Sequence, residues 1–477
     1  MDATLSSSRS ARTWVLALTS LASLMVALDA LVVMTALSSI RVDLHASLEA
    51  LEWTVNAYTL TFAVLLMTAS VLGDRLGRRR LFVAGVALFS AASAACALAP
   101  GAGWLIAARA LQGSGAALVL PLALALLSAA FPPERRATAL GIFSSVTGLA
   151  VLGGPVVGGA ITEGIAWQWI FWLNVPLGLA LIPLSLRHLR ESLGPPARLD
   201  VAGLALITCA AFGLVWGLVR GNSLGWGSAE VLAALTGGLA LLAGFVAWEL
   251  RVREPMLPMR LFRSRAFAAG NAAGFLMTAA LFGAVFFMAQ FLQTAQGHGP
   301  LDAGIRLLPW TATLFVIAPV AGAAVSRVGE RPLIAGGLPL QAIGMAWLAL
   351  VAEPGVAYGQ MVAPLIVAGP GASMAIPPSQ SAVVGAVAPE HIGRAAGTFT
   401  TMRQLGAAFG VAILVAVFAG AGSYVSPQDF SDGFAPAIGV AALLSLAGAI
   451  AGAALPRRRL RPHVSPAPAA TPVEGTR

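Results

Sequence analysis

Three ionisable residues lie inside long apolar stretches of the sequence, where a charge is costly. They are Asp29, Arg109 and Arg403. On insertion scales, a charged side chain at the centre of a bilayer costs about 2.5–3.5 kcal/mol. We therefore expect each of them to face the interior of a helix bundle and to be there for a functional reason.

Asp29 and Arg109 are predicted to lie in the same half of the membrane. At a helical rise of 1.5 Å per residue, Asp29 lies about 22 Å from Trp14 and Arg109 about 8 Å from Trp104. Arg109 can therefore reach Asp29 or stabilise its charged form. Desolvation favours the protonated form of a buried carboxyl, which is what coupling to protons requires. An ion pair with a purely structural role is the alternative.

The elements that position these residues are expected to be membrane-spanning helices. The chain has 477 residues, of which 58% are hydrophobic and 10% charged, far outside the range of soluble domains. One span takes about 20 apolar residues, and the apolar runs predict an all-α membrane protein with fourteen spans. The expected spans are residues 14–38, 53–72, 81–99, 104–130, 138–161, 168–186, 201–219, 230–249, 266–292, 303–326, 332–351, 357–379, 395–420 and 434–455.

The composition argues against several other classes of protein. Every basic residue other than histidine is an arginine. Without lysine the chain has neither a Walker-type phosphate loop nor a Schiff-base lysine, so we expect no ATP-driven pump. We also expect that the protein is not an enzyme. Cys96 and Cys209 lie in apolar runs as small packing residues, and the five histidines lack ligand spacing. We expect no metal and no cofactor.

The net charge of +9 reflects membrane topology rather than nucleic-acid binding. With an N-terminus in the cytoplasm, nearly all arginines fall in the termini and the even-numbered loops, and the odd-numbered loops hold only Arg41, Arg220 and Arg306. This positive-inside bias places both termini in the cytoplasm. The opposite rim carries the tryptophans of an interfacial belt: Trp53, Trp104, Trp167 and Trp226.

An internal repeat divides the chain into two related halves. The segment 73–79 aligns with 325–331, and after a short insertion 113–116 aligns with 369–372. Two pseudo-symmetric six-helix bundles with two inserted spans are implied, and parallel repeats of this kind place a substrate site between two bodies that rock. The expected parts are a cytoplasmic N-terminus (1–13), a first bundle (14–190), inserted spans seven and eight with linkers (191–265), a second bundle (266–456) and a disordered basic cytoplasmic tail (457–477).

The loop 73–80 carries five formal charges between two uncharged runs. Gly77 permits a tight turn, and Asp74 can pair with an arginine such as Arg78 or with the N-terminus of an adjacent helix. These features predict a latch that forms when the cytoplasmic ends close. A basic loop that only orients the protein is the alternative. The second copy has Ser326 in place of the acid, so the latch is expected to be asymmetric.

This loop resembles the signature loop between the second and third helices of the major facilitator superfamily, and the whole chain resembles its fourteen-span drug/proton antiporters. Asp29 matches the acid of a first-span signature, although Leu31 and Met34 replace the two polar residues that follow it. The run 109–115, which contains Arg109, Gln112, Gly113 and Gly115, matches the arginine–glutamine–glycine motif of the fourth span. The stretch 167–178 resembles the entry to the sixth span, and we assign its aromatics to the interface.

The fifth span resembles a motif shared by the exporters of the superfamily. Small residues there permit close approach of helices, and a proline permits a bend. The direction of transport rests on this resemblance alone, and a generic packing seam is the alternative. The motif consists of Gly148, Gly153, Gly154, Pro155, Gly158 and Gly159.

The resemblance implies proton-coupled secondary efflux of amphipathic drugs or antibiotics by alternating access. The expected partners are a small amphipathic substrate, protons and membrane lipids, with no nucleic acid, and we expect a monomer in the cell membrane. Export of one endogenous metabolite, solute import, and a channel or scaffold are the alternatives. The implied coupling and substrate residues are Asp29, Arg109, Gln112 and Arg403, and the implied cytoplasmic gate is Asp74, Arg75, Gly77 and Arg78.

Overall fold

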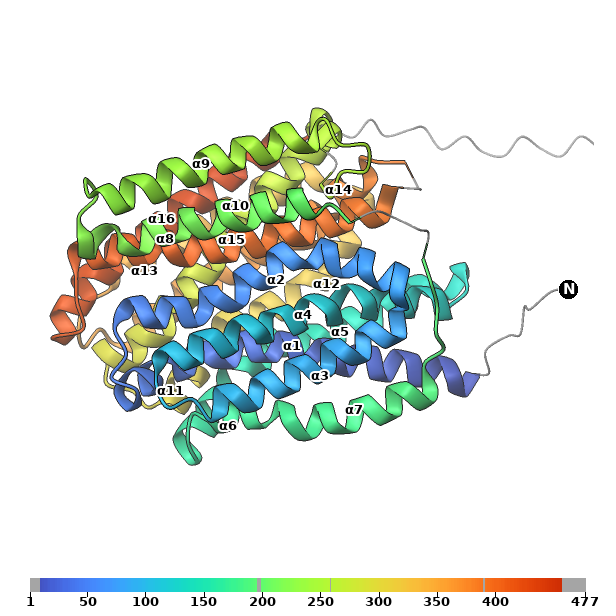
Figure 1. Ribbon diagram of the computed structural model, residues 1–477. Coiled ribbons are helices and arrows are strands. Elements are labelled where there is room, and N and C mark those ends of the chain that lie inside the picture. The colour runs from blue at the N-terminus through green and yellow to red at the C-terminus, as the bar shows by residue number, and fades with distance from the viewer. Residues whose placement is uncertain (1–8, 195–198, 258, 389–390, 457–477) are drawn as a thin grey trace, which may run out of the picture.

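The computed structural model describes residues 9–194, 199–257, 259–388 and 391–456 (Figure 1). Within these ranges the chain is helical, without strands, and has 14 helices long and apolar enough to cross a membrane. The expected all-α fold class is confirmed. The basic tail expected at 457–477 and most of the N-terminal segment 1–13 lie outside the described residues.

The first bundle contains six spans, the last of which is divided into two helices at Leu173. Its second and third helices meet at Gly77, whose φ of 112° ends one helix and begins the next. Such a positive φ suits glycine, which lacks a Cβ. The helices are α1 (Arg9–Asp43), α2 (Leu48–Leu76), α3 (Arg78–Ala97), α4 (Ala102–Ala130), α5 (Pro133–Gly164), α6 (Trp169–Trp172) and α7 (Asn174–His188).

The inserted spans and the second bundle follow. Four prolines lie inside α14 without ending it, and the tenth span is divided after Arg306. The elements are α8 (Val201–Leu224), α9 (Ala229–Glu249), the 3-10 helix η1 (Met259–Arg263), α10 (Arg265–Gln290), the π-helix η2 (Phe291–Ala295), α11 (Pro300–Arg306), α12 (Leu308–Val328), α13 (Glu330–Val351), α14 (Tyr358–Gly385), α15 (Ile392–Ala421) and α16 (Pro427–Ala453).

Several helices extend beyond the apolar runs from which they were predicted. The first was expected at 14–38, but α1 begins at Arg9 and ends at Asp43. Arg41, which was assigned to a loop, therefore belongs to the last turn of α1. Hydropathy detects only the apolar core of a span, whereas backbone hydrogen bonding continues through the polar turns at its ends.

Within each bundle the helices pack side by side, and α8 bridges the two bundles. In the first bundle α4 packs against α2 and α3, and in the second α13 packs against α14 and α16. The inserted pair α8 and α9 pack on each other along one side of the molecule (Figure 1). Because α8 contacts both α2 and α15, it touches one helix of each bundle.

The two bundles are in contact at the end of the molecule opposite the N-terminus, which we call the distal rim. It comprises the ends of α1 and α5 with the start of α11 (Figure 1). There Gln293 donates to the carbonyl of Thr35 at 2.9 Å, and the Leu301 amide donates to Glu163 at 2.9 Å. These hydrogen bonds join the first bundle to the second, so the distal rim is closed in this conformation.

Candidate functional site

Asp29 lies in the middle of α1 and forms an ion pair inside the first bundle. Its side chain is fully buried, and Arg109 Nη1 on α4 lies 2.5 Å from Asp29 Oδ2. The predicted contact between these two residues is therefore present. Gln112, one turn further along α4, donates to Asp29 Oδ1 at 2.7 Å and accepts from Arg109 Nη1 at 2.7 Å. We call the group of polar residues around this ion pair the Asp29 cluster.

Two residues that the sequence did not single out complete the hydrogen bonds of the cluster. Asn174, the first residue of α7, donates to Asp29 Oδ1 at 2.9 Å. Ser93 on α3 accepts from Gln112 Nε2 at 2.8 Å and donates to the carbonyl of Phe89 at 2.8 Å. The Asp29 carboxylate therefore has three side-chain donors, one charged and two neutral.

Arg109 has partners that do not depend on Asp29. Its Nε donates to the carbonyl of Thr54 at 3.1 Å, and its guanidinium lies 4.2 Å from the centre of the Tyr58 ring. Tyr58 is itself fixed by a hydrogen bond to the carbonyl of Val26 at 3.2 Å. A buried cation is costly unless it is paired and hydrogen-bonded. These additional contacts can stabilise Arg109 when the charge on Asp29 changes.

Glycines in α4 bring the helices of the cluster together. A Cβ on Gly113 would lie 2.3 Å from the carbonyl oxygen of Tyr58, and one on Gly115 would lie 2.7 Å from the backbone nitrogen of Phe89. Real Cβ atoms do not approach that closely, so any larger residue would push α4 away from α2 and α3. The glycines of the predicted motif therefore set the helix spacing that lets Arg109 and Gln112 reach Asp29.

Arg403 lies apart from the cluster. It belongs to α15 in the second bundle, where its Nε lies 3.4 Å from Thr278 Oγ1 on α10 and its guanidinium 5.9 Å from the Phe399 ring. Among the described residues it forms no ion pair. Of the four predicted coupling and substrate residues, Asp29, Arg109 and Gln112 are in contact with one another. Arg403 is not in contact with them.

The basic loop is held by two acids, of which the sequence identified one. Asp74 Oδ1 lies 2.8 Å from Arg78 Nε. The N-terminus of α3 is capped by Glu191, whose carboxylate accepts from the backbone amides of Arg79 and Arg80 at 2.9 and 3.2 Å. Arg75 is exposed. Glu191 follows α7, far away in sequence, so the pattern of the loop alone did not indicate it.

The exporter-type motif forms a contact seam on α5. Gly154 and Gly158 face α1, where a Cβ on Gly158 would lie 2.7 Å from the carbonyl oxygen of Val32. Gly159 faces α11, with its Cβ position 2.3 Å from the carbonyl oxygen of Pro300. Gly148 has only ordinary contacts, and a Cβ on Gly153 would meet only Val157 of the same helix. The close contacts of α5 with both bundles therefore come from three of the five glycines.

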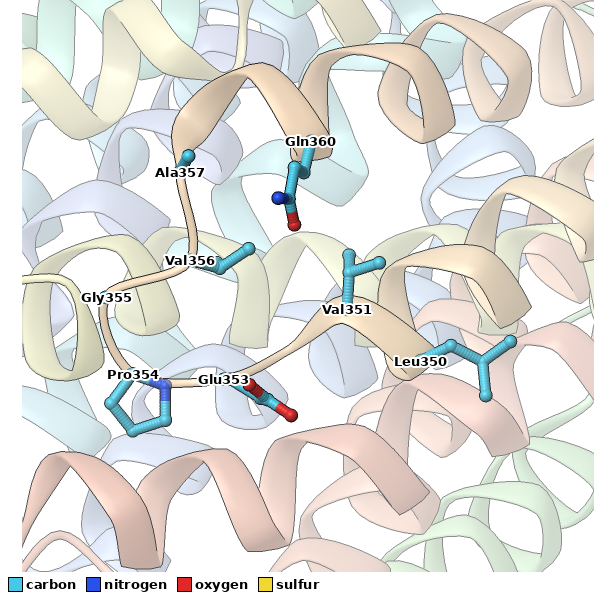
Figure 2. A pocket seen from close by; sticks show the side chains of 8 residues that line it. All are labelled: Leu350, Val351, Glu353, Pro354, Gly355, Val356, Ala357 and Gln360. Carbon is cyan, nitrogen blue, oxygen red and sulfur yellow. The ribbon is translucent and has the colours of Figure 1, made fainter.

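Two hollows lie outside the cluster. The first has a volume of about 300 Å³ and an apolar lining from α2, α4 and α8 that includes Trp53, Ala110 and Phe212. The second has a volume of about 480 Å³ and lies at the turn between α13 and α14 (Figure 2). Figure 2 shows Val351, Val356 and Gln360 around this open depression. Neither hollow is lined by Asp29 or Arg109.

The described residues form two bundles of six spans with a further pair inserted between them, and an ion pair is buried inside the first bundle; this is the architecture of a secondary membrane transporter. Residues 19–411 match the family model described as Major Facilitator Superfamily. The chain belongs to this superfamily.

Several curated relatives are similar over most of their length. A tetracenomycin C resistance and export protein of Streptomyces glaucescens is 36% identical over 87% of this chain and 78% of its own. A methylenomycin A resistance protein of Streptomyces coelicolor is 35% identical over 91% of both chains. A cephamycin export protein of Amycolatopsis lactamdurans is 34% identical over 96% of this chain and 97% of its own.

Solved structures show the same fold at low sequence identity. A crystal structure of a peptide transporter in complex with sulfate has a TM-score of 0.66 and 17% identity, and covers 91% of this chain and 93% of its own. A bacterial homologue of the human lysosomal transporter Spinster has a TM-score of 0.64 and 16% identity, and covers 94% and 97%. The major facilitator fold is thereby confirmed.

Proposed function

We propose that this protein exports drugs or antibiotics across the cytoplasmic membrane in exchange for protons. The observation that carries the proposal is the buried Asp29–Arg109 ion pair. It lies in a chain that is similar in sequence to resistance and export proteins. The protein is a transporter that needs neither metal nor cofactor, because the proton gradient supplies the energy. It acts as a monomer surrounded by membrane lipids.

Asp29 is the proposed carrier of the coupled proton. In the conformation described, its carboxylate can hold its charge because Arg109, Gln112 and Asn174 all donate to it. A proton on Asp29 would cancel the charge, and Arg109 would keep Gln112, the Thr54 carbonyl and the Tyr58 ring as partners. One carboxyl can therefore alternate between two charge states: when Asp29 is protonated, Arg109 loses its counter-charge but keeps its hydrogen bonds and its contact with the Tyr58 ring.

The seam on α5 is the proposed surface on which the bundles move. Gly154 and Gly158 let α5 approach α1, and Gly159 lets it approach α11 of the other bundle. Alternating access requires the contacts at one end to break while those at the other end form. We assign the distal rim to the extracellular side and both termini to the cytoplasm, in keeping with the arginine distribution.

The basic loop is the proposed cytoplasmic gate. Asp74 and Arg78 fix the turn around Gly77, and Glu191 connects that turn to the segment that follows α7. Arg75 is exposed and free to contact the other bundle during the cycle. In the second bundle Arg403 is the proposed contact for substrate, since it is a partly buried cation without a carboxylate among the described residues.

The proposed substrates are small amphipathic compounds that are neutral or singly charged. A buried double positive charge would need more than one interior carboxylate, and the Asp29 cluster supplies one. Efficient transport of hydrophobic dications would contradict this assignment.

Uptake into everted membrane vesicles tests the direction and range of transport. Export from cells corresponds to uptake by such vesicles, so an imposed proton gradient with an acidic interior should drive accumulation of a singly charged amphipathic dye. Accumulation under the opposite gradient would indicate an importer instead. A panel of compounds then distinguishes a multidrug exporter from an exporter of one metabolite, because only the former transports many of them.

A further inference from the structure

A second acid, Glu52, is buried in α2 and takes no part in the Asp29 cluster. Its side chain is fully buried, and Oε1 accepts from Asn56 Nδ2 at 3.3 Å. Its other oxygen, Oε2, has no hydrogen-bond partner among the described residues. Asn56 is also fully buried, and its Oδ1 likewise has no partner there. Two acceptor oxygens, Glu52 Oε2 and Asn56 Oδ1, are therefore without a hydrogen-bond donor among the described residues.

Charged residues on the helices packed against α2 have other partners. Arg41, in the last turn of α1, lies over the ring of Tyr424. Glu49, one turn nearer the distal rim on α2, pairs with Arg220 of α8 at 3.2 Å. Arg220 also lies 3.7 Å from Glu230. On the α4 side of α2, Arg109 is paired with Asp29. None of the ion pairs in the described part of the chain includes Glu52.

Helix α15, which packs against α2, has no cation at the depth of Glu52. Glu52, Asn56, Thr59 and Ala63 recur at helical spacing and share one face of α2. Ala63 on that face packs with residues of α15 in a cluster that includes Leu405, Ala408 and Ala412. The ionisable residues of α15 are Arg394 and Arg403, both nearer its other end, and Arg403 contacts Thr278.

A buried carboxylate with no cation and too few donors is unfavourable, whereas the neutral acid is not. A proton on Oε2 would turn an acceptor without a partner into a donor. The Glu52–Asn56 pair would then have the additional donor hydrogen that it lacks. The seam between α2 and α15 joins the two bundles, and it must part near the distal rim when that rim opens. Water would then reach Glu52.

We propose that Glu52 is a second proton-binding site, which carries a proton while the α2–α15 seam is closed and loses it to water on the distal side when the seam opens. Closing the seam takes up one proton from that side, and opening it returns one. Glu52 therefore sets the pH dependence of closure, whereas Asp29 carries the proton that is transported. This inference rests on the proposed proton-coupled function.

Distance measurements across the distal rim test the proposal on the full-length protein. With Cys96 and Cys209 replaced by alanine, spin labels at Leu98 and Leu350 would report the separation of the bundles, since both side chains are exposed at distal ends of helices. In the wild-type background, the ratio of closed to open molecules should rise by up to about tenfold for each unit of falling pH, as expected for one linked proton.

The variant Glu52→Gln should remain closed across the whole pH range, because the amide is a neutral isostere that also supplies a donor. The matched control is Glu49→Gln, one turn away on the same helix. It removes a partly exposed acid and its pair with Arg220, so the closed fraction should fall at every pH, but the slope of the ratio with pH should stay that of the wild type. If Glu52→Gln does not fold, Glu52→Met provides an apolar side chain of similar length and the same expected result. Infrared spectra should show a carboxylic-acid carbonyl band that Glu52→Gln or Glu52→Met lacks.

A wild-type pH dependence in Glu52→Gln or Glu52→Met would overturn the inference, and so would an unchanged carboxylic-acid band. Failure of the proposed function looks different. In that case the wild-type protein itself would show no gradient-driven transport in everted vesicles, whatever the behaviour of Glu52.

Discussion

The Asp29 carboxylate receives hydrogen bonds from two helices: Arg109 and Gln112 lie on α4, and Asn174 lies on α7. An ion pair in a low-dielectric interior is stable only when its remaining hydrogen-bonding groups are satisfied. Here both partners are satisfied. At the residue scale, the amides therefore matter as well as the charges, because they would hold the carboxylate in place through the proposed changes of its protonation state.

Replacing Asn174 by alanine should lower coupled transport without preventing insertion. The substitution removes one of the three donors to Asp29, and such a loss in a buried site costs about 1–3 kcal/mol. The transport rate in everted vesicles should fall about tenfold or more. The matched control is Asn271→Ala, since Asn271 is equally buried but donates only to the Phe267 carbonyl of its own helix. Equal loss in both variants would contradict a specific role for Asn174.

The sequence indicated Asp29 and Arg109 because a charge inside an apolar run is conspicuous, and it indicated Gln112 through the motif of the fourth span. Asp29, Arg109 and Gln112 were predicted and do meet. Ser93 and Asn174 were not, since neutral polar residues are common in spans and their role depends on which helix they face. The signal available in the sequence was an asparagine, Asn174, inside the sixth span and shortly after the interfacial aromatics.

At the scale of elements, α5 packs closely on helices of both bundles. It packs against α1 through Gly154 and Gly158 and against α11 through Gly159. The motif predicted a glycine-rich seam, but it did not show which glycines form it. The backbone positions of α1 and α11 decide that, and those follow from tertiary packing that no local pattern specifies.

Alanine at Gly158 and at Gly153 should have opposite effects. In Gly158→Ala the new methyl would collide with the backbone of Val32, and overpacking of this kind costs about 1–3 kcal/mol. In Gly153→Ala the methyl has space, and the loss of a helical glycine should stabilise the protein by about 0.5–1 kcal/mol. Thermal unfolding in detergent and vesicle transport check both. A harmless Gly158→Ala would show that the seam is not tightly packed.

The inserted helices contribute to the whole molecule by bridging the bundles. Near the distal rim, Arg220 of α8 pairs with Glu49 of the first bundle at 3.2 Å. Asn222 of α8 donates to the Ala416 carbonyl of the second bundle at 2.5 Å. The sequence predicted that the two spans are inserted but did not assign them a role. Their contacts favour the conformation in which the distal rim is closed.

Replacing Asn222 by alanine should make the distal rim open more readily. One hydrogen bond contributes about 1 kcal/mol net, so the ratio of open to closed molecules should rise about fivefold. Spin labels at Leu98 and Leu350 measure this ratio. The control is Ser223→Ala, because the Ser223 hydroxyl bonds only within α8, to the Arg220 carbonyl. An unchanged ratio in Asn222→Ala would argue against a bridging role for α8.

The division into two bundles and an inserted pair was predictable from the whole sequence, because repeats and charge bias extend over many residues. The conformation could not be predicted from the sequence, because the inward-open and outward-open states consist of the same helices. Contacts such as Gln293 with Thr35 and Leu301 with Glu163 reveal that the distal rim is closed here. Tyr424 also contributes, since its hydroxyl donates to Gln290 and Arg41 of the other bundle lies over its ring.

The most direct test of the account is gradient-driven dye accumulation by everted vesicles that contain either wild-type protein or Asp29→Asn. The asparagine keeps the size of the side chain but cannot alternate between charged and neutral forms. We predict that the variant reaches the membrane in normal amounts and accumulates no dye, whereas the wild-type protein accumulates it under an imposed proton gradient. Equal accumulation by the two proteins would contradict the central role of Asp29 in proton coupling.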